Sequence, residues 1–368
     1  MIRAAAKFAP LLAGLLAATA AYAQDIVRLD EFENRNHPQI GYWFLTPEIV
    51  ENGKYLTDFD DMLDKAPYDL YFLDAREGSD FTQLDPMHEV VKNIVERAHE
   101  RDVKVGIRLY LMPKTPLTRE DRDAFLGDCS ARLNRHGRGS CPVSTRFIRH
   151  KEQVVEKRVY RVFAFRETKH GFYEPGSLRE IDDFSTRVKS SGIDVSIEAG
   201  PELAGYTAFV MAEFQLPAPS NLSPRAIREA MNFIDAYSDI PLDGIMLDEY
   251  KNWAVIPPWE LMFRLGDVRY RRYSKDLADE LERRTGEAAE LTLFHMRHAP
   301  EGRPEVRMKA INDYMDLVRE GPLRVENAVY ERSKEVFGND MFMSAHNTFH
   351  NNIEGDEIWQ TGLKWWST

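Results

Sequence analysis

The chain has 368 residues, 43% of them hydrophobic, which is enough for one large domain or two average ones with a substantial core. Its 60 acidic residues outnumber its 48 basic residues. This negative balance argues against nucleic acid and anionic membranes as partners, and it leaves the class of substrate open.

The first residues have the layout of a secretory signal peptide. Two basic residues, Arg3 and Lys7, precede an apolar run over residues 8–20, and small residues follow this run. That run is shorter than the roughly 20 residues that cross a bilayer, which disfavours a membrane anchor. We therefore expect residues 1–23 to be cleaved off and the mature protein to be periplasmic or secreted. Without Arg3 and Lys7 the mature chain keeps 46 basic against 60 acidic residues, a net charge near −14.

From residue 40 onward, short apolar runs alternate with amphipathic segments, which is the pattern of β/α units around a parallel sheet. Asp85-Pro86 is typical of a helix start, with an N-cap followed by a first-turn proline. Repeated steps of this kind favour a parallel, right-handed winding. The predicted elements, in chain order, are a strand at 40–45, a helix at 55–65, a strand at 68–73, a helix at 85–101 and a strand at 103–111.

The regular alternation stops between residues 113 and 219. β-rich pieces at 158–166, 186–197 and 206–216 are separated there by Gly, Pro and charged clusters. We interpret residues 113–219 as an antiparallel, β-rich insertion after the third strand. An independent β-domain is the alternative, although the pieces look too few and too irregular for a full sandwich.

The chain has two cysteines, Cys129 and Cys141, which lie close together in what reads as a Gly- and Arg-rich loop. Metal ligation needs more partners than two thiols, and a catalytic thiol needs a nearby base. In an oxidising compartment this pair therefore predicts a local disulfide.

The helical pattern resumes at Ser223-Pro224, again with a cap and a first-turn proline. A closed barrel of this class has eight strands. We therefore expect residues 24–368 to form a (β/α)8 TIM-type barrel that is either incomplete at its C-terminal end or continued beyond residue 368. The predicted elements of this half are a helix at 223–237, a strand at 242–247, helices at 259–284 and 306–337, a strand at 341–345 and a weak sixth strand at 362–366.

Ligands of parallel β/α folds bind at the carboxyl ends of the strands, so polar residues at those ends are the candidate site. The candidates from the five strands are, in order, Tyr42, Trp43, Thr46 and Glu48; Asp74, Arg76 and Glu77; Arg108 and Tyr110; Asp248, Glu249 and Tyr250; and His346, Asn347 and His350.

The fourth strand carries the strongest of these signals. It is apolar and ends abruptly in Asp248 and Glu249, and two unpaired carboxylates are too costly to bury. They either line a polar cleft or form ion pairs with Arg76 and Arg108. Strand alternation allows at most one of the two to point squarely into a barrel mouth. Arg108 is accordingly either an ion-pair partner or a substrate contact.

The segment 241–249 reads Pro, Leu-Asp-Gly, an apolar triplet and Asp-Glu. Together with Trp43 on the first strand and His346-Asn347 on the fifth, it resembles the (β/α)8 glycoside hydrolases. The resemblance implies that Glu249 is the carboxylic acid that protonates the glycosidic oxygen.

In many retaining members of that family an Asn precedes this Glu, whereas this chain has Asp248, which we expect to orient Glu249 or to bind substrate. Glycoside hydrolysis uses two carboxylates, closer together for retention than for inversion. The second one is expected to be Asp74, Glu77 or a residue beyond Thr368.

Aromatic residues beside carboxylates suit a saccharide cleft, because sugar rings stack on flat apolar faces. Most aromatics near the site are expected to be ordinary packing, with Trp43 and Trp253 as the stacking platforms. His346 and Asn347 either hydrogen-bond sugar hydroxyls or belong to a polar loop held by its own side chains. The predicted saccharide-binding set is Trp43, Asp74, Arg76, Arg108, Tyr110, Tyr250, Trp253, His346 and Asn347.

Three functions follow from these residues. The first is a glycosidase that cleaves a polysaccharide or oligosaccharide with Glu249 and Asp248 and without a cofactor. The second is a non-catalytic carbohydrate-binding barrel. The third is a metal-dependent hydrolase that uses His346 or His350 with Asp248, although their spacing matches no standard zinc motif.

Overall fold

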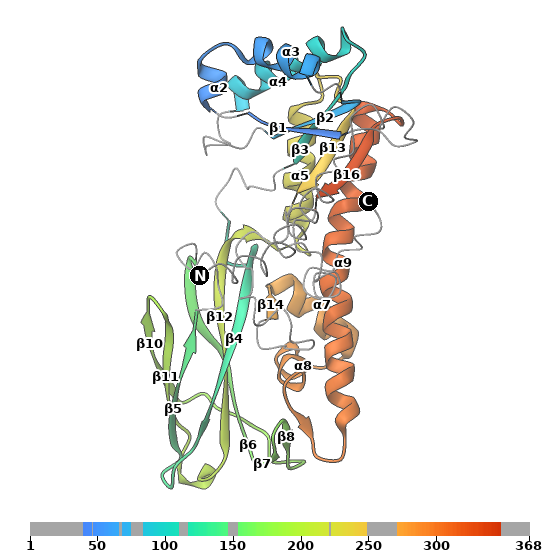
Figure 1. Ribbon diagram of the computed structural model, residues 1–368. Helices are drawn as coiled ribbons and strands as arrows, with labels where there is room; N and C mark the ends of the chain where they lie inside the picture. Colours follow the sequence, from blue (N-terminus) through green and yellow to red (C-terminus); the bar gives the residue numbers. More distant parts are fainter. Residues whose placement is uncertain are drawn as a thin grey trace, which may run out of the picture.

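The computed structural model describes residues 40–45, 47–65, 68–74, 84–109, 117–145, 154–220, 222–248 and 271–346. In this part of the chain the protein is a mixed α/β protein, with a parallel sheet at one end and antiparallel sheets at the other (Figure 1). The predicted signal peptide lies outside these residues. Within them, no helix is both long and apolar enough to span a membrane.

Five parallel strands form one sheet in the order β1-β2-β3-β13-β16. They are β1 (Ile40–Phe44), β2 (Leu70–Asp74), β3 (Lys104–Leu109), β13 (Gly244–Asp248) and β16 (Phe342–His346). All five predicted strands are confirmed, with shifts of one or two residues at their ends. Strands that follow one another in the chain are neighbours in the sheet, so the winding proceeds in one direction. The described strands make an open sheet, and the predicted sixth strand at 362–366 lies outside the described residues.

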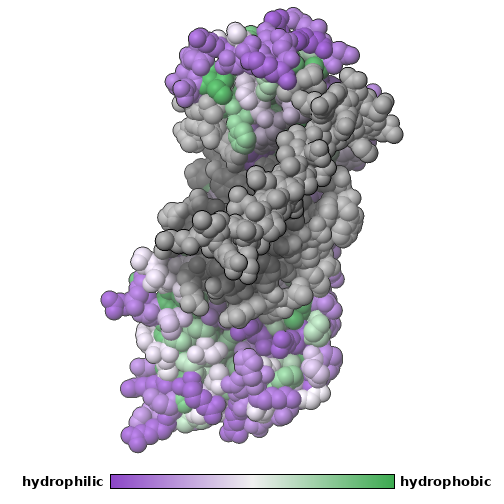
Figure 2. Space-filling view, in the orientation of Figure 1, coloured by the Kyte–Doolittle hydropathy of each residue, from purple (hydrophilic) through white to green (hydrophobic). Residues whose placement is uncertain are grey.

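Helices cover one face of this sheet. They are α2 (Pro47–Glu51), α3 (Tyr55–Lys65), α4 (Leu84–His99), α5 (Pro224–Ala236) and the second half of α9 (Pro304–Phe337). Fully buried side chains such as Val91, Ile107 and Ile234 join them to the strands, and each stabilises the fold by about 1.5–3 kcal/mol. The predicted cap of α5 is confirmed, because Ser223 Oγ accepts a hydrogen bond from the Arg225 amide at 3.2 Å. On the face that Figure 2 shows, the outermost residues at this end of the molecule are mostly hydrophilic.

A β-rich unit follows β3. Its larger sheet has the order β14-β4-β12-β6-β9 and its smaller sheet the order β10-β11-β5, and all these pairings are antiparallel. The strands are β4 (Arg122–Arg132), β5 (Arg138–Ser144), β6 (Glu156–Phe165), β9 (Arg179–Glu180), β10 (Phe184–Lys189), β11 (Gly192–Glu198), β12 (Thr207–Pro219) and β14 (Arg271–Tyr273). A single apolar core that includes Phe125, Val195 and Phe214 lies between the two sheets. The two sheets therefore pack face to face.

The opposite face of the larger sheet is covered by helices from a later part of the chain. They are α7 (Lys275–Thr285), α8 (Ala289–His295) and the first half of α9 (Pro304–Phe337). A third, small sheet of β7 (Glu167–Lys169), β8 (Phe172–Tyr173) and β15 (Ala299–Pro300) and the 3-10 helix η4 (Pro201–Leu203) complete the unit. The β-rich unit thus includes residues 271–318, which the sequence assigned to the barrel.

Strand β14 corrects one helix prediction. The sequence predicted a helix over 259–284, but residues 271–273 pair with β4 and the helix α7 begins at Lys275. Tyr273 is buried against Tyr160, with ring centroids 4.6 Å apart. This contact with a strand more than 100 residues away outweighs the local helical pattern. Residues 259–270 lie outside the described residues.

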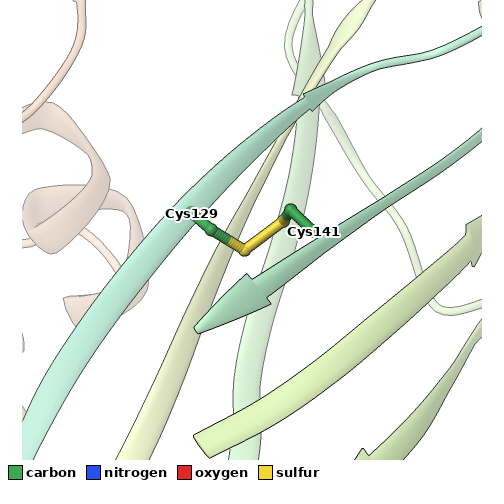
Figure 3. The surroundings of a disulfide bond; sticks show 2 residues. All are labelled: Cys129 and Cys141. Atoms are coloured by element: carbon green, nitrogen blue, oxygen red, sulfur yellow. A yellow bond between two sulfur atoms is a disulfide. The ribbon is translucent and has the colours of Figure 1, made fainter. Parts of the chain in front are cut away.

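The predicted disulfide is present and joins Cys129 of β4 to Cys141 of β5, with Cα atoms 6.1 Å apart (Figure 3). Both cysteines lie in strands rather than in the loop that the sequence suggested. The two strands belong to different sheets, so the bond links the larger sheet to the smaller one. It also closes a short loop and limits the freedom of the unfolded chain.

Helix α9 confirms the predicted helix at 306–337 and connects the two units (Figure 1). Its first half contributes Tyr314 and Leu317 to the core beneath the larger antiparallel sheet. Its second half contributes Val325 and Val329 to the core of the parallel sheet. One continuous helix is therefore buried against both units.

Candidate functional site

The two faces of the parallel sheet differ in chemistry. Strand alternation places Tyr71 and Leu73 of β2 against the helices, where both are buried in the apolar core. Phe72 and Asp74 therefore lie on the opposite face, where Phe72 packs with Met246 of β13. In a β/α-barrel this second face lines the interior, so side chains at its carboxyl edge are the ones that can meet a ligand.

A cluster of two buried residues and one partly buried residue lies at the carboxyl edge of this face. The Tyr42 hydroxyl donates a hydrogen bond to Asp74 Oδ2 at 2.9 Å. Arg108 donates to the same carboxylate oxygen from NH1 and forms an ion pair with it. The side chains of Asp74 and Arg108 are 0% and 3% exposed, and the guanidinium carbon lies 5.9 Å from the centre of the Tyr42 ring. Three adjacent strands thus hold one charged hydrogen-bonded cluster.

Burial makes this cluster rigid. Separating two buried charges is unfavourable, because an unpaired buried ion costs several kcal/mol. The attraction between them is also stronger than at the surface, where water screens it. Asp74 and Arg108 are therefore fixed in position before any ligand binds, which is the property required of residues that position a substrate.

An apolar layer supports the cluster from below. The ring of Phe72 lies over Gly106 of β3, where an added Cβ would come within 2.4 Å of it. Met246 and the partly buried Phe342 continue this layer toward the far edge of the sheet. The glycine makes room for Phe72, so the middle of this face is apolar, while Lys104 at its amino edge lies 4.7 Å from the centre of the Phe342 ring.

The strongest sequence candidate lies next in the sheet. Asp248 is the last residue of β13 and pairs in register with His346, the last residue of β16. Alternation assigns position 248 to the same face as Met246, one layer beyond Arg108, which is in register with Met246. The residues Asp74, Arg108, Asp248 and His346 are therefore on strands whose carboxyl ends lie along one edge.

Part of the motif that suggested this site has a structural role instead. Asp243 Oδ2 accepts hydrogen bonds at 2.8 Å from the Val105 amide and from His99 of α4, at the amino edge of the sheet. At Gly244 an added Cβ would lie 2.7 Å from the carbonyl oxygen of Phe342. The Asp-Gly pair is thus explained by strand packing, and the functional signal narrows to Asp248 and the residue after it.

The β-rich unit adjoins the same edge of the sheet. Helices of β/α units run antiparallel to the strands, so α5 begins at the carboxyl edge. Only residues 220–223 separate the end of β12 from this helix. The Ser274 hydroxyl at the start of α7 donates to Ser220 Oγ at 2.9 Å, which ties the second segment of the unit to the same place. A ligand at the carboxyl edge would therefore lie beside the β-rich unit.

The structure places the remaining predicted residues as follows. Trp43 lies on the helix-covered face, where its ring stacks on Phe59 of α3 with centroids 5.4 Å apart, so its position does not favour a sugar platform. Glu48 is exposed on α2. The residues outside the described part are Thr46, Arg76, Glu77, Tyr110, Glu249, Tyr250, Trp253, Asn347 and His350.

Sequence reasoning favoured Trp43 over Tyr42, although Tyr42 is the aromatic residue that contacts the cluster. The two are consecutive in a strand and point to opposite faces, and an apolar strand gives no sign of which face is covered by helices. Leu45 lies two residues after Trp43 and therefore on the same face of the strand, and it is buried in the helix-covered core. This apolar residue is the feature of the sequence that indicates which face the helices cover.

Among the described residues, no group of three or more His, Cys, Asp or Glu side chains is arranged to hold a metal ion.

No protein-family model and no curated protein matches this chain. Among solved structures, Cryptosporidium parvum pyruvate kinase is similar at 12% identity with a TM-score of 0.22, over 91% of this chain and 70% of that chain. The same enzyme in complex with ADP is similar at 14% identity with a TM-score of 0.21, over 94% and 70% of the two chains. At these TM-scores the similarity supports no conclusion about fold or function.

Proposed function

We propose that this protein is an exported glycoside hydrolase-like enzyme that cleaves glycosidic bonds in a polysaccharide or oligosaccharide. The observation that carries the proposal is the Tyr42–Asp74–Arg108 cluster, a fixed polar group at the carboxyl edge of a parallel sheet. Asp248 ends the strand next to Arg108 on this edge. In this proposal the five described strands are part of a (β/α)8 barrel.

Glu249 is proposed as the general acid that protonates the glycosidic oxygen, with Asp248 orienting it or binding substrate. The family resemblance of the segment 241–249 supports this assignment. A carboxylic acid that acts in this way needs a pKa near the working pH.

The cluster on β1 to β3 is proposed to position the substrate. Because the Asp74 carboxylate is held by both Tyr42 and Arg108, it has a fixed orientation rather than the freedom of a surface side chain. The same contacts affect whether Asp74 can act as the second catalytic carboxylate. Asp74 is neutralised by a buried guanidinium, which favours a positioning role over nucleophilic attack.

A non-catalytic carbohydrate-binding barrel is the second candidate, and the state of Asp74 is the observation that favours it. If Asp74 is only a counter-ion of Arg108, a second catalytic carboxylate has to come from a residue outside the described part of the chain. A protein without one would bind saccharides and release no sugar.

The experiment that tests the proposal is a screen of the purified mature protein against a panel of polysaccharides, with release of reducing ends as the readout. We expect Glu249→Gln to lower kcat at least about 100-fold, the usual contribution of a general acid, while binding of the cleaved polysaccharide persists. Glu96→Gln, which changes an exposed carboxylate in the second half of α4, is the matched control and should retain full activity.

Three results separate the candidates. Turnover that depends on Glu249 supports the glycosidase. Saccharide binding without any released sugar in the wild-type protein supports the binding barrel. Undiminished turnover in Glu249→Gln contradicts the proposed role of this residue, and loss of that turnover with a chelator would instead support the metal-dependent hydrolase.

A further inference from the structure

Helix α9 changes its packing partner halfway along its length. Up to Val318 its buried side chains, which include Tyr314 and Leu317, belong to the core of the β-rich unit. From Val325 onward they belong to the core of the parallel sheet. The Tyr314 hydroxyl donates to the Arg272 carbonyl at 3.0 Å in the β-rich unit, and Arg332 pairs with Asp235 of α5 in the other. Each half of the helix is therefore fixed to a different unit.

The residues between the two halves are Gly321 and Pro322. Both are poor helix residues, because glycine has the greatest backbone freedom and proline has no amide hydrogen. Without that hydrogen, residue 322 cannot donate to the carbonyl of Val318. Sharp bends in long helices occur almost always at such residues. The weakest point of this 34-residue helix thus coincides with the boundary between the units.

Ion pairs with α7 cross this weak point. Arg284 donates to Glu320 at 2.5 Å, just before Gly321. Arg324, just after Pro322, lies 3.7 Å from Glu280 of α7 and 3.3 Å from Glu320. These side chains are between 18% and 45% exposed, so salt weakens their attraction. These ion pairs, which we call the clamp, connect α7 to both sides of Gly321-Pro322, and the salt concentration changes their strength.

We propose that Gly321-Pro322 is a hinge at which the β-rich unit moves relative to the parallel sheet, with the ion pairs between α7 and α9 as its clamp. The β-rich unit adjoins the carboxyl edge that carries Asp74 and Arg108, so bending at this point changes the space over that edge. The use of this motion to open and close over a saccharide rests on the proposed function. The hinge itself does not, and it is tested without any ligand.

The test is a distance distribution between two spin labels, one in each unit, by pulsed electron spin resonance. Asp61 of α3 and Ser196 of β11 are exposed and can be replaced by cysteine for labelling, while the native cysteines stay in their disulfide. Pro322→Ala restores the missing amide hydrogen, and we expect it to narrow the distribution about twofold. Asn312→Ala, an exposed change in the half of α9 that packs on the β-rich unit, is the control and should leave the width unchanged.

A separate experiment tests the clamp and does not depend on the folding of Pro322→Ala. Glu280→Gln weakens the clamp and should broaden the distribution, as should raising the salt concentration with the wild-type protein. Equal widths for wild type, Pro322→Ala and Glu280→Gln at low and high salt would overturn the hinge. Because no saccharide is present, that outcome would leave the proposed activity untouched.

Discussion

The two units of this protein differ in how exposed the arginine partners of their buried carboxylates are. In the β-rich unit the buried carboxylates of Glu213, Asp123 and Asp128 pair with arginines that keep 38%, 19% and 27% of their side chains exposed. In the parallel unit, Asp74 and Arg108 are both buried. Partly exposed pairs remain solvated and suit a scaffold. A fully enclosed pair at the carboxyl edge of a parallel sheet is costly to build, and this cost is the basis of the positioning role that we propose for it.

The largest expected effect is on the enclosed pair. Arg108→Met removes the guanidinium that pairs with the buried Asp74 carboxylate, and we expect it to lower the free energy of unfolding by about 3–5 kcal/mol in urea denaturation. Arg272→Met should cost less, because the Arg272 side chain is 19% exposed and water partly screens its attraction to the buried Asp123. Equal losses in the two variants would remove the contrast between the units.

The disulfide comes next. Replacing Cys129 and Cys141 together by alanine should cost about 3 kcal/mol, the loop-closure contribution for a loop of this size. The loss should be confined to the β-rich unit. Hydrogen exchange should therefore accelerate in β4, β5 and β12 and stay unchanged in β2 and β3. Faster exchange in both units would show that they unfold together.

A smaller effect is expected at the amino edge of the parallel sheet. Asp243→Ala removes the acceptor of the Val105 amide and the partner of His99, and we expect a loss of about 1–3 kcal/mol without any change in saccharide binding. His99→Ala removes only the partly exposed contact and should cost less than about 1 kcal/mol. A loss of binding in Asp243→Ala would contradict its assignment to strand packing.

The smallest effect concerns pH. Burial lowers the pKa of His295, whose Nε2 lies 3.1 Å from the Tyr173 hydroxyl in the β-rich unit. The unfolded chain therefore binds the proton more readily, so stability falls as pH drops through about 6.5, the ordinary pKa, and levels off below the folded-state pKa. His295→Gln should flatten the stability profile between pH 7 and pH 5, as measured by urea denaturation across this range. An unchanged slope would show that other groups cause it.

The sequence predicted the parallel strands well because their signals are local. An apolar run bounded by polar residues identifies β2 or β13 without knowledge of its partners, and Ser223-Pro224 marks the start of α5 by its own hydrogen bond. The short strand β14 has no such signal. This strand forms because it pairs with the edge of β4 and because Tyr273 packs against Tyr160.

The candidate site was predicted only in part, for the same reason. The sequence named Asp74 and Arg108 as separate candidates, but their pairing depends on the register of two strands that are 34 residues apart in the chain. The choice between Tyr42 and Trp43 depends on which face the helices cover. Both are tertiary properties, and the amphipathic pattern of a single strand does not encode them.

The most direct test of the account is a crystal structure of the Glu249→Gln protein with the oligosaccharide that the wild-type protein releases from its polysaccharide. We predict the sugar at the carboxyl edge of the parallel sheet, beside Asp248 and in the layer above Asp74 and Arg108. A sugar bound only on the antiparallel sheets, or an empty carboxyl edge at saturating ligand, would contradict the central claim.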